Sequence, residues 1–279
     1  MAMGLFFWRK NKINREAFIK GAVFLLLLSL IVVIFWQKTE FSSSDLGRHI
    51  ENGRVVFSNP SVLFSNFYSY TEPGIRFVNH HWLSGVVYYG SYLAFGFSGL
   101  HVLNILVVLA AFIIFFLLAR KKANFYTVSL LSLPVIFLLS ERVEVRPEIF
   151  SYLFLGITWL MLESKKISGK KRLFILFPLF VLWANMHICF FLGLGLVFFW
   201  LADKIIRDSH FSDFRKIRKV FNRFKIEISL FISLIVASLL TPNHFLYKNQ
   251  VPPNYSRSIL NRDLYVKTSA FYLNLSLKI

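Results

Sequence analysis

Long apolar runs alternate along the chain with short polar or basic segments. Apolar runs of about 20 residues are typical of helices that cross a lipid bilayer. The pattern predicts membrane-spanning helices at about 20–36, 99–118, 125–140, 149–162 and 226–240. Several of these runs are shorter than the bilayer core requires, so their polar ends must lie below the membrane surface or the bilayer must thin around them.

The longest apolar stretch, Leu173 to Ala202, contains the polar sequence WANMH near its middle. A single crossing would place the basic loops 165–172 and 204–225 on opposite sides of the membrane, against the positive-inside rule. Two short helices, 172–184 and 188–202, place both loops in the cytoplasm. We therefore expect WANMH at the tip of a helical hairpin, facing a recessed polar cavity that opens to the outer side.

The segment 82–97 is also apolar, but it is short, rich in Tyr and interrupted by glycines. If it crossed the membrane, the basic residues Arg120, Lys121 and Lys122 would move to the outer side. We therefore expect 82–97 to be an interfacial helix that lies on the outer membrane surface.

These assignments predict an all-α, polytopic membrane helix bundle with about seven transmembrane helices. A large first extracytoplasmic loop, 37–98, carries the interfacial helix. A tail, 241–279, follows the last span. We expect residues 1–279 to form one membrane domain. We also expect a multi-pass protein of the cell membrane, which in a bacterium with two membranes is the inner one.

Composition supports a membrane protein, because 56% of the 279 residues are hydrophobic and 33 are Phe. The net charge of +18 could indicate nucleic-acid binding, but most Lys and Arg residues lie in short clusters on the predicted cytoplasmic side, so we expect no nucleic-acid partner. The single cysteine, Cys189, lies in an apolar run, which excludes a disulfide framework and a Cys-based metal motif.

Most of the unusual polar residues fall on the predicted outer side. Asp45 and His49 are four residues apart, so on a helix they share a face and could act as an acid/base couple, although Asp45 could equally be a helix N-cap. His80 and His81 precede Trp82, where they could bind a ligand or anchor an interfacial helix. The pair alone does not make a metal site, because no complete ligand set is present.

Two further groups on this side combine charge with an apolar setting. Arg146 precedes Pro147, which would start a helix and hold the guanidinium at the membrane surface, where it can bind phosphate. A solvated loop is the alternative there. Asn185 and His187 lie at membrane depth, where polar residues are either functional or form hydrogen bonds between helices.

Five stretches in this order resemble one family: DLGRHIENGRVVFSNP, FYSYTEPGIRFVNHHWL, RPEIFSYLF, WANMHICFFLGLGL and TPNHF. They are similar to bacterial membrane glycosyltransferases of the GT-C class, among the uncharacterised relatives of enzymes that use a polyprenyl-phosphate sugar. The similarity extends over about 41–246.

The resemblance implies an inverting transfer of a sugar from a polyprenyl-phosphate carrier to an acceptor at the outer membrane face. Asp45 occupies the usual catalytic position and would take the proton of the acceptor hydroxyl. The residues expected to bind substrate are His49, His80, His81, Arg146, Glu148, Asn185, His187 and Asn243. The partners would be the lipid-linked sugar donor, membrane lipids and an acceptor whose identity the sequence does not reveal.

The chain also departs from the family pattern. Relatives commonly have Glu at the position of His81, so a second acid is missing and assistance by a divalent metal is not supported; we expect no cofactor. Relatives usually continue with further spans beyond the position of Ile279, which predicts a C-terminally truncated copy. Two interpretations therefore stay open: an active transferase, or a non-catalytic membrane protein, which is either a remnant of that fold or a protein that binds or transports lipid-linked sugars.

Overall fold

The computed structural model describes residues 2–38, 44–64, 79, 81–208 and 222–242. Within these ranges the chain forms α-helices and a short 3-10 helix, with no strand. The all-α prediction is therefore confirmed for the described part of the chain.

The chain divides into two compact units. The first unit comprises Met1–Phe41 and His101–Val145, and the second comprises Ser42–Leu100 and Arg146–Ile279. The helices, in chain order, are α1 (Ala2–Lys38), α2 (Ser44–Ser58), the 3-10 helix η1 (Pro60–Phe64), α3 (Trp82–Arg120), α4 (Phe125–Leu139), α5 (Glu148–Glu163), α6 (Gly169–Met186), α7 (Phe190–Asp208) and α9 (Lys225–Leu239). Each segment expected to span the membrane is helical, and the boundary between the units falls within α3.

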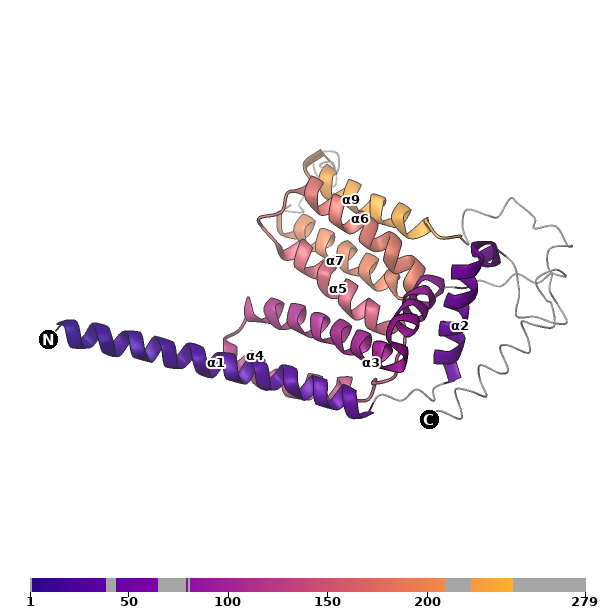
Figure 1. Ribbon diagram of the computed structural model, residues 1–279. Helices are drawn as coiled ribbons and strands as arrows, with labels where there is room; N and C mark the ends of the chain where they lie inside the picture. Colours follow the sequence, from indigo (N-terminus) through magenta and orange to yellow (C-terminus); the bar gives the residue numbers. More distant parts are fainter. Residues whose placement is uncertain (1, 39–43, 65–78, 80, 209–221, 243–279) are drawn as a thin grey trace, which may run out of the picture. The chain divides into compact units, whose positions relative to one another are not determined.

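In the first unit, α1 packs along α4 (Figure 1). Phe24 of α1 also meets Phe116 of α3, with ring centroids 4.9 Å apart. The start of α4 is fixed by Asn124, whose side chain accepts a hydrogen bond from the Thr127 backbone N–H at 3.0 Å. Such a cap satisfies one of the free N–H groups in the first turn of a helix.

α3 contains a break in its helical conformation at Gly96, which has φ 60° and ψ −146°. Only glycine adopts this region without steric cost. The break separates the Tyr-rich segment expected to lie on the membrane surface from the apolar segment expected to cross it. The boundary between these two expected helices therefore coincides with a backbone feature.

In the second unit, α5, α6, α7 and α9 lie side by side (Figure 1). α6 ends at Met186, His187 is extended with φ −158° and ψ 142°, and α7 begins at Phe190. A Cβ atom on Gly193 would lie 2.4 Å from the ring of Trp183, so the absence of a side chain lets α7 approach that ring. The two helices expected on either side of WANMH are both present.

α2 and α3 cross at a pair of glycines in the second unit. A Cβ atom on Gly53 would lie 1.9 Å from the carbonyl oxygen of Gly85, and a Cβ atom on Gly85 would lie 2.8 Å from that of His49. The two backbones therefore touch directly. Next to this crossing, Val55 and Val56 of α2 pack with Val62 of η1 in a small apolar core.

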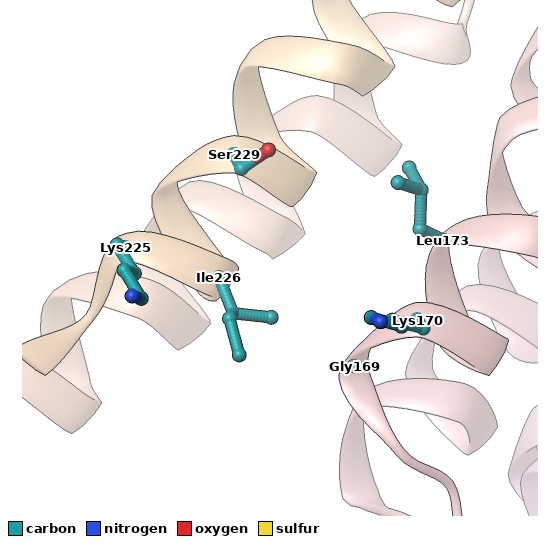
Figure 2. A pocket seen from close by; sticks show the side chains of 6 residues that line it. All are labelled: Gly169, Lys170, Leu173, Lys225, Ile226 and Ser229. Carbon is teal, nitrogen blue, oxygen red and sulfur yellow. The ribbon is translucent and has the colours of Figure 1, made fainter.

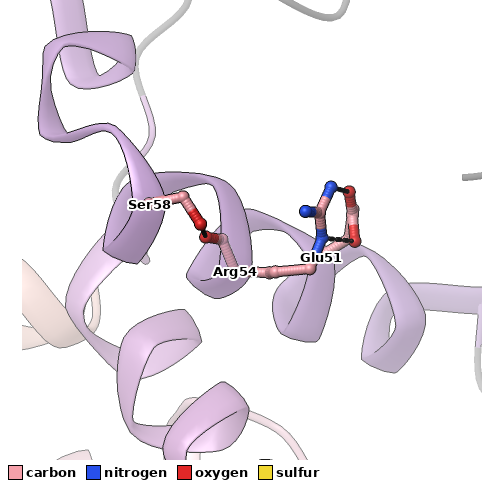
Figure 3. A network of polar contacts seen from close by, with 3 residues as sticks. All are labelled: Glu51, Arg54 and Ser58. Atoms are coloured by element: carbon pink, nitrogen blue, oxygen red, sulfur yellow. Dashed lines mark hydrogen bonds and ion pairs between the residues drawn. The ribbon is translucent and has the colours of Figure 1, made fainter. Parts of the chain in front are cut away.

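A half-buried ion pair links successive turns of α2 (Figure 3). Arg54 donates two hydrogen bonds to the carboxylate of Glu51, one through Nε at 2.9 Å and one through Nη2 at 2.6 Å. Ser58 Oγ donates to the Arg54 carbonyl at 2.9 Å. Because Glu51 is buried, this two-point pairing supplies the partner that its charge needs.

By length and composition, two helices of the described part could cross a membrane: Arg15–Trp36 within α1, and Trp82–Arg120. α4 is apolar but shorter. These helices include the first two spans expected from the sequence, and the other expected spans belong to the proposal below.

Two introduced cysteines test the orientation. In a Cys189→Ser background, we expect Ser58→Cys at the exposed end of α2 to react with a membrane-impermeant thiol reagent from outside. Lys166→Cys, in the exposed turn before α6, should react only from inside. The nearby exposed residue Ser168 is less suitable for labelling, because its side chain caps α6 by accepting a hydrogen bond from the Lys171 N–H. Reaction of both cysteines from the same side would contradict the predicted topology.

Candidate functional site

Three histidines from distant parts of the chain meet in the second unit. His49 lies on α2, His81 directly precedes α3, and His187 connects α6 to α7. The ring centroids of His49 and His81 are 5.6 Å apart, and those of His81 and His187 are 5.3 Å apart and nearly parallel. His49 and His187 are buried. The fold therefore groups three of the residues that the sequence marked as candidate ligand-binding residues.

His187 is held by a hydrogen-bonded chain that starts at Trp183. The indole N–H of Trp183 donates to Ser151 Oγ at 2.8 Å, and Ser151 Oγ lies 2.7 Å from His187 Nδ1. An indole nitrogen can only donate, so Ser151 Oγ accepts from Trp183. We therefore assign the Ser151 hydroxyl as the donor and His187 Nδ1 as the acceptor of the second hydrogen bond. In this arrangement the proton of the neutral imidazole is on Nε2.

Asn185 connects three segments through one side chain. Its Oδ1 accepts from Trp82 Nε1 at 2.7 Å, and its Nδ2 donates to the carbonyls of Val181 at 2.7 Å and Leu240 at 2.9 Å. The amide thereby joins the start of α3 and the end of α9 to α6. Both of its N–H groups are used, which gives Asn185 a positioning role; its expected binding of substrate stays a prediction.

The position of His81 is fixed by its own neighbours. Asn79 Oδ1 accepts from the His81 backbone N–H at 3.2 Å, and the His81 carbonyl accepts from Ser84 Oγ at 2.8 Å. These bonds form a turn that leads into α3. The turn brings the His81 ring between the other two histidines.

The surroundings disfavour protonation of the two buried imidazoles. Burial, followed by the charges of His81 and Arg48, lowers the pKa of His49 to about 4, and Arg146 also lowers it, whereas Asp45 raises it. Burial and the neighbouring His81 lower the pKa of His187 to about 4. Both rings are therefore neutral at pH 7 and can act as hydrogen-bond donors or acceptors without charge.

Several buried polar atoms near this cluster have no hydrogen-bond partner within the described residues: His49 Nδ1, Asn52 Oδ1, Asn79 Nδ2 and Tyr88 OH. The Tyr88 ring lies 6.2 Å from the His49 ring, and Asn52 is one helical turn after His49. A buried polar atom without a partner costs about 1–3 kcal/mol. Such atoms therefore indicate a place where a polar ligand, or a segment outside the described residues, supplies the missing bonds.

The charged candidates lie around the same cluster. Asp45 is in the first turn of α2, within the helix rather than before it as an N-cap, and its carboxylate accepts from Arg48 at 2.9 Å. It lies on the same helix as His49, as the spacing predicted. Arg146 precedes Pro147 and the first residue of α5, Glu148, as the sequence indicated. The positive charge of Arg146 acts on His49, which places it near the cluster.

The remaining predicted residues, His80 and Asn243, lie outside the described residues. No group of three or more His, Cys, Asp or Glu side chains in the described part of the chain is arranged to hold a metal ion.

Sequence reasoning missed Ser151, Asn79, Asn52 and Tyr88. Ser151 is a lone hydroxyl in an otherwise apolar run, and its position one helical turn after Pro147 was the available signal. The other three follow only from the packing of α2 against α3.

Comparisons of this chain with protein-family models, with curated proteins and with solved structures find no match.

The low pKa values of His49 and His187 predict acid sensitivity. Because each pKa is lowered by folding, the unfolded chain binds protons first, and stability falls as the pH decreases from about 6.5 towards about 4. The loss should be of the order of 3 kcal/mol for each histidine. Melting temperatures of the purified protein in detergent at pH 7.5 and 4.5 measure this loss.

The variants His49→Gln and His187→Gln cannot gain a proton, so each should lose less stability between these two pH values than the wild type does. The comparison uses the decrease within each variant, which separates acid sensitivity from any general destabilisation. An equal decrease in all three proteins would show that other groups cause it.

Proposed function

We propose that the chain is a multi-pass membrane glycosyltransferase that transfers a sugar from a polyprenyl-phosphate carrier to an acceptor at the extracytoplasmic face, with inversion at the anomeric carbon. The observation that carries the proposal is the convergence of His49, His81 and His187 with Arg146 nearby. These residues come from four of the five stretches that resemble the GT-C class, together with Asp45.

The cluster fits recognition of a phosphate ester. Arg146 supplies a permanent charge and a planar fork, which matches phosphate oxygens better than a single ammonium does. The imidazoles of His49 and His187 are neutral, so they add hydrogen bonds without adding positive charges that repel Arg146. His187, with Nδ1 engaged by Ser151, keeps its Nε2–H as a donor. Arrangement of the donors before substrate binds is the condition for stabilising a leaving group.

Asp45 completes the proposed reaction as the general base. Its carboxylate takes the proton of the acceptor hydroxyl while the hydroxyl oxygen forms a bond to the anomeric carbon. The bond from that carbon to the carrier phosphate breaks, and the phosphate leaves as an anion held by Arg146 and the histidines. Attack opposite the leaving group inverts the anomeric centre, so no covalent enzyme intermediate is needed.

The multi-pass arrangement is supported by large apolar side chains on the outside of the helices. In the second unit, Phe174 on α6 is 80% exposed and Phe199 on α7 is 70% exposed. In the first unit, Leu130 and Phe137 of α4 are each 67% exposed. Apolar surface on so many helices is costly in water and favourable in lipid.

A second function, binding or transport of a lipid-linked sugar without catalysis, is favoured by one observation. The Asp45 carboxylate already accepts a hydrogen bond from Arg48, and both side chains are partly exposed. Asp203 and Arg207 on α7 form a pair of the same kind on an exposed helix surface, outside the proposed site. In that case the phosphate-binding cluster would work without a base.

The variant Asp45→Asn separates the two functions. It should reduce transfer from a radiolabelled polyprenyl-phosphate sugar roughly 100-fold or more, because the amide keeps the shape but cannot take a proton. Binding of the donor should change little. Transfer is measured with purified protein and normalised to folded material.

The matched control is Asp203→Asn on α7, which removes an exposed carboxylate that is likewise paired with an arginine of its own helix, Arg207. It should leave transfer unchanged. Full activity in Asp45→Asn would exclude the catalytic role, and binding of the donor by an inactive wild-type protein would favour the non-catalytic function.

The variant Arg146→Lys tests phosphate recognition. It keeps the charge but loses the planar fork, so we expect the dissociation constant for a polyprenyl phosphate to rise about tenfold, which corresponds to about 1.4 kcal/mol. The control is Arg142→Lys in the same segment, where the side chain is exposed. Equal affinities in the two variants would show that Arg146 is an ordinary surface charge.

A further inference from the structure

A cavity of about 330 Å³ lies between α6 and α9, at the ends where both helices begin. It is lined by residues of the first turns of these helices: Gly169, Lys170, Leu173, Lys225, Ile226 and Ser229. Figure 2 shows the side chains of α6 on one side of the space and those of α9 on the other. Both helices run in the same direction from this end, which is the predicted cytoplasmic side.

Two lysines, one from each helix, give the cavity a positive charge. In the described part of the chain no hydrogen bond or ion pair engages the ammonium group of Lys170 or Lys225. The neighbouring Lys204, by contrast, contacts Glu227 at 2.7 Å. The positive ends of two helix dipoles add to the charge of the free lysines. The cavity therefore attracts an anion.

Apart from the two lysines and the hydroxyl of Ser229, the lining is apolar. Leu173 and Ile226 form a wall beside the lysines, and Ile226 is 53% exposed. Gly169 lets this wall close, because a Cβ atom there would lie 2.4 Å from Cγ2 of Ile226. A small inorganic ion would leave this apolar surface in contact with water, whereas an amphipathic ligand covers it.

An adjacent group of side chains places this end of the helices at a membrane surface. Two cations lie over the ring of Trp200 on α7. Arg172 Cζ is 5.3 Å and Lys204 Nζ is 4.7 Å from the ring centroid. Arg172 also donates to the carbonyls of Met161 at 3.0 Å and Ser164 at 3.1 Å. Trp with Lys or Arg is the combination that marks the boundary between lipid and water.

The segment 209–221, which precedes α9 in the sequence, contains four basic residues, Arg215, Lys216, Arg218 and Lys219, and one acidic residue, Asp213. The net charge of this segment has the same sign as the charge of the cavity, so charge complementarity favours an acidic partner over this segment.

We propose that the cavity between α6 and α9 binds the headgroup of an anionic phospholipid, with the lipid phosphate between Lys170 and Lys225 and the first part of an acyl chain against Leu173 and Ile226. The cytoplasmic leaflet is the membrane surface that carries anionic lipid. The site lies at the opposite end of α6 from His187, so it is separate from the proposed sugar-transfer site.

Native mass spectrometry of the full-length protein in detergent, titrated with equal amounts of phosphatidylglycerol and phosphatidylcholine, tests the proposal. The wild type should retain phosphatidylglycerol selectively. The double variant Lys170→Gln/Lys225→Gln should bind it roughly tenfold more weakly, because each lysine contributes to attraction of the phosphate. Ser229→Phe keeps both lysines but fills the cavity, and it should lose the selective binding as well.

The control is Lys165→Gln/Lys166→Gln, which removes the same charge from the turn before α6 but not from the cavity, and it should bind like the wild type. Unchanged phosphatidylglycerol binding in either cavity variant would overturn the proposal. Complete displacement of the lipid by millimolar inorganic phosphate would also overturn it, because the site would then hold the anion alone. The measurement involves no sugar transfer, so its result is independent of the proposed catalytic function.

Discussion

The side-chain amide of Asn185 is the interaction on which the arrangement of the second unit depends. Its oxygen accepts a hydrogen bond from the indole N–H of Trp82 at the start of α3. Its nitrogen donates to the carbonyl of Leu240 after α9 and to that of Val181 within α6. Loss of this amide would leave an indole N–H and a carbonyl without partners at a buried position, at about 1–3 kcal/mol each. Because His81 directly precedes Trp82, the same bonds also determine where the histidine cluster forms.

The cluster combines two requirements that usually conflict, which are burial and polarity. Three neighbouring imidazoles with Arg146 nearby would repel one another if all were charged, and burial removes the proton from His49 and His187. The neutral rings keep directional hydrogen bonds, and Ser151 fixes the tautomer of His187. The result is a site in which the permanent charge of Arg146 stands beside uncharged hydrogen-bonding rings, which suits a phosphate that gains charge as it leaves.

The all-α class and the positions of most helices could be predicted from the sequence, because long apolar runs are local signals. The break at WANMH follows from charge alone, and the structure ends α6 at Met186. The contacts within the site could not be predicted in the same way. Trp82 and Asn185 are 103 residues apart, and the role of Ser151 depends on the direction in which α5 faces α6. The close approach of Gly53 to Gly85 likewise has no local signature beyond the glycines themselves.

The length of α6 is compatible with the proposed crossing of the membrane between the two proposed sites. Its 18 residues extend over about 27 Å at a rise of about 1.5 Å per residue, close to the thickness of a bilayer core of about 30 Å. Arg172, beside Trp200, marks one end of this helix, and Asn185 and His187 mark the other. In the proposed multi-pass arrangement, a helix of this length would place its two polar ends at the two membrane surfaces, and exposed residues such as Phe174 would face lipid between them. The basic first turn of α6 makes its composition less apolar than that of α3, but a first turn at the surface needs no apolar side chains.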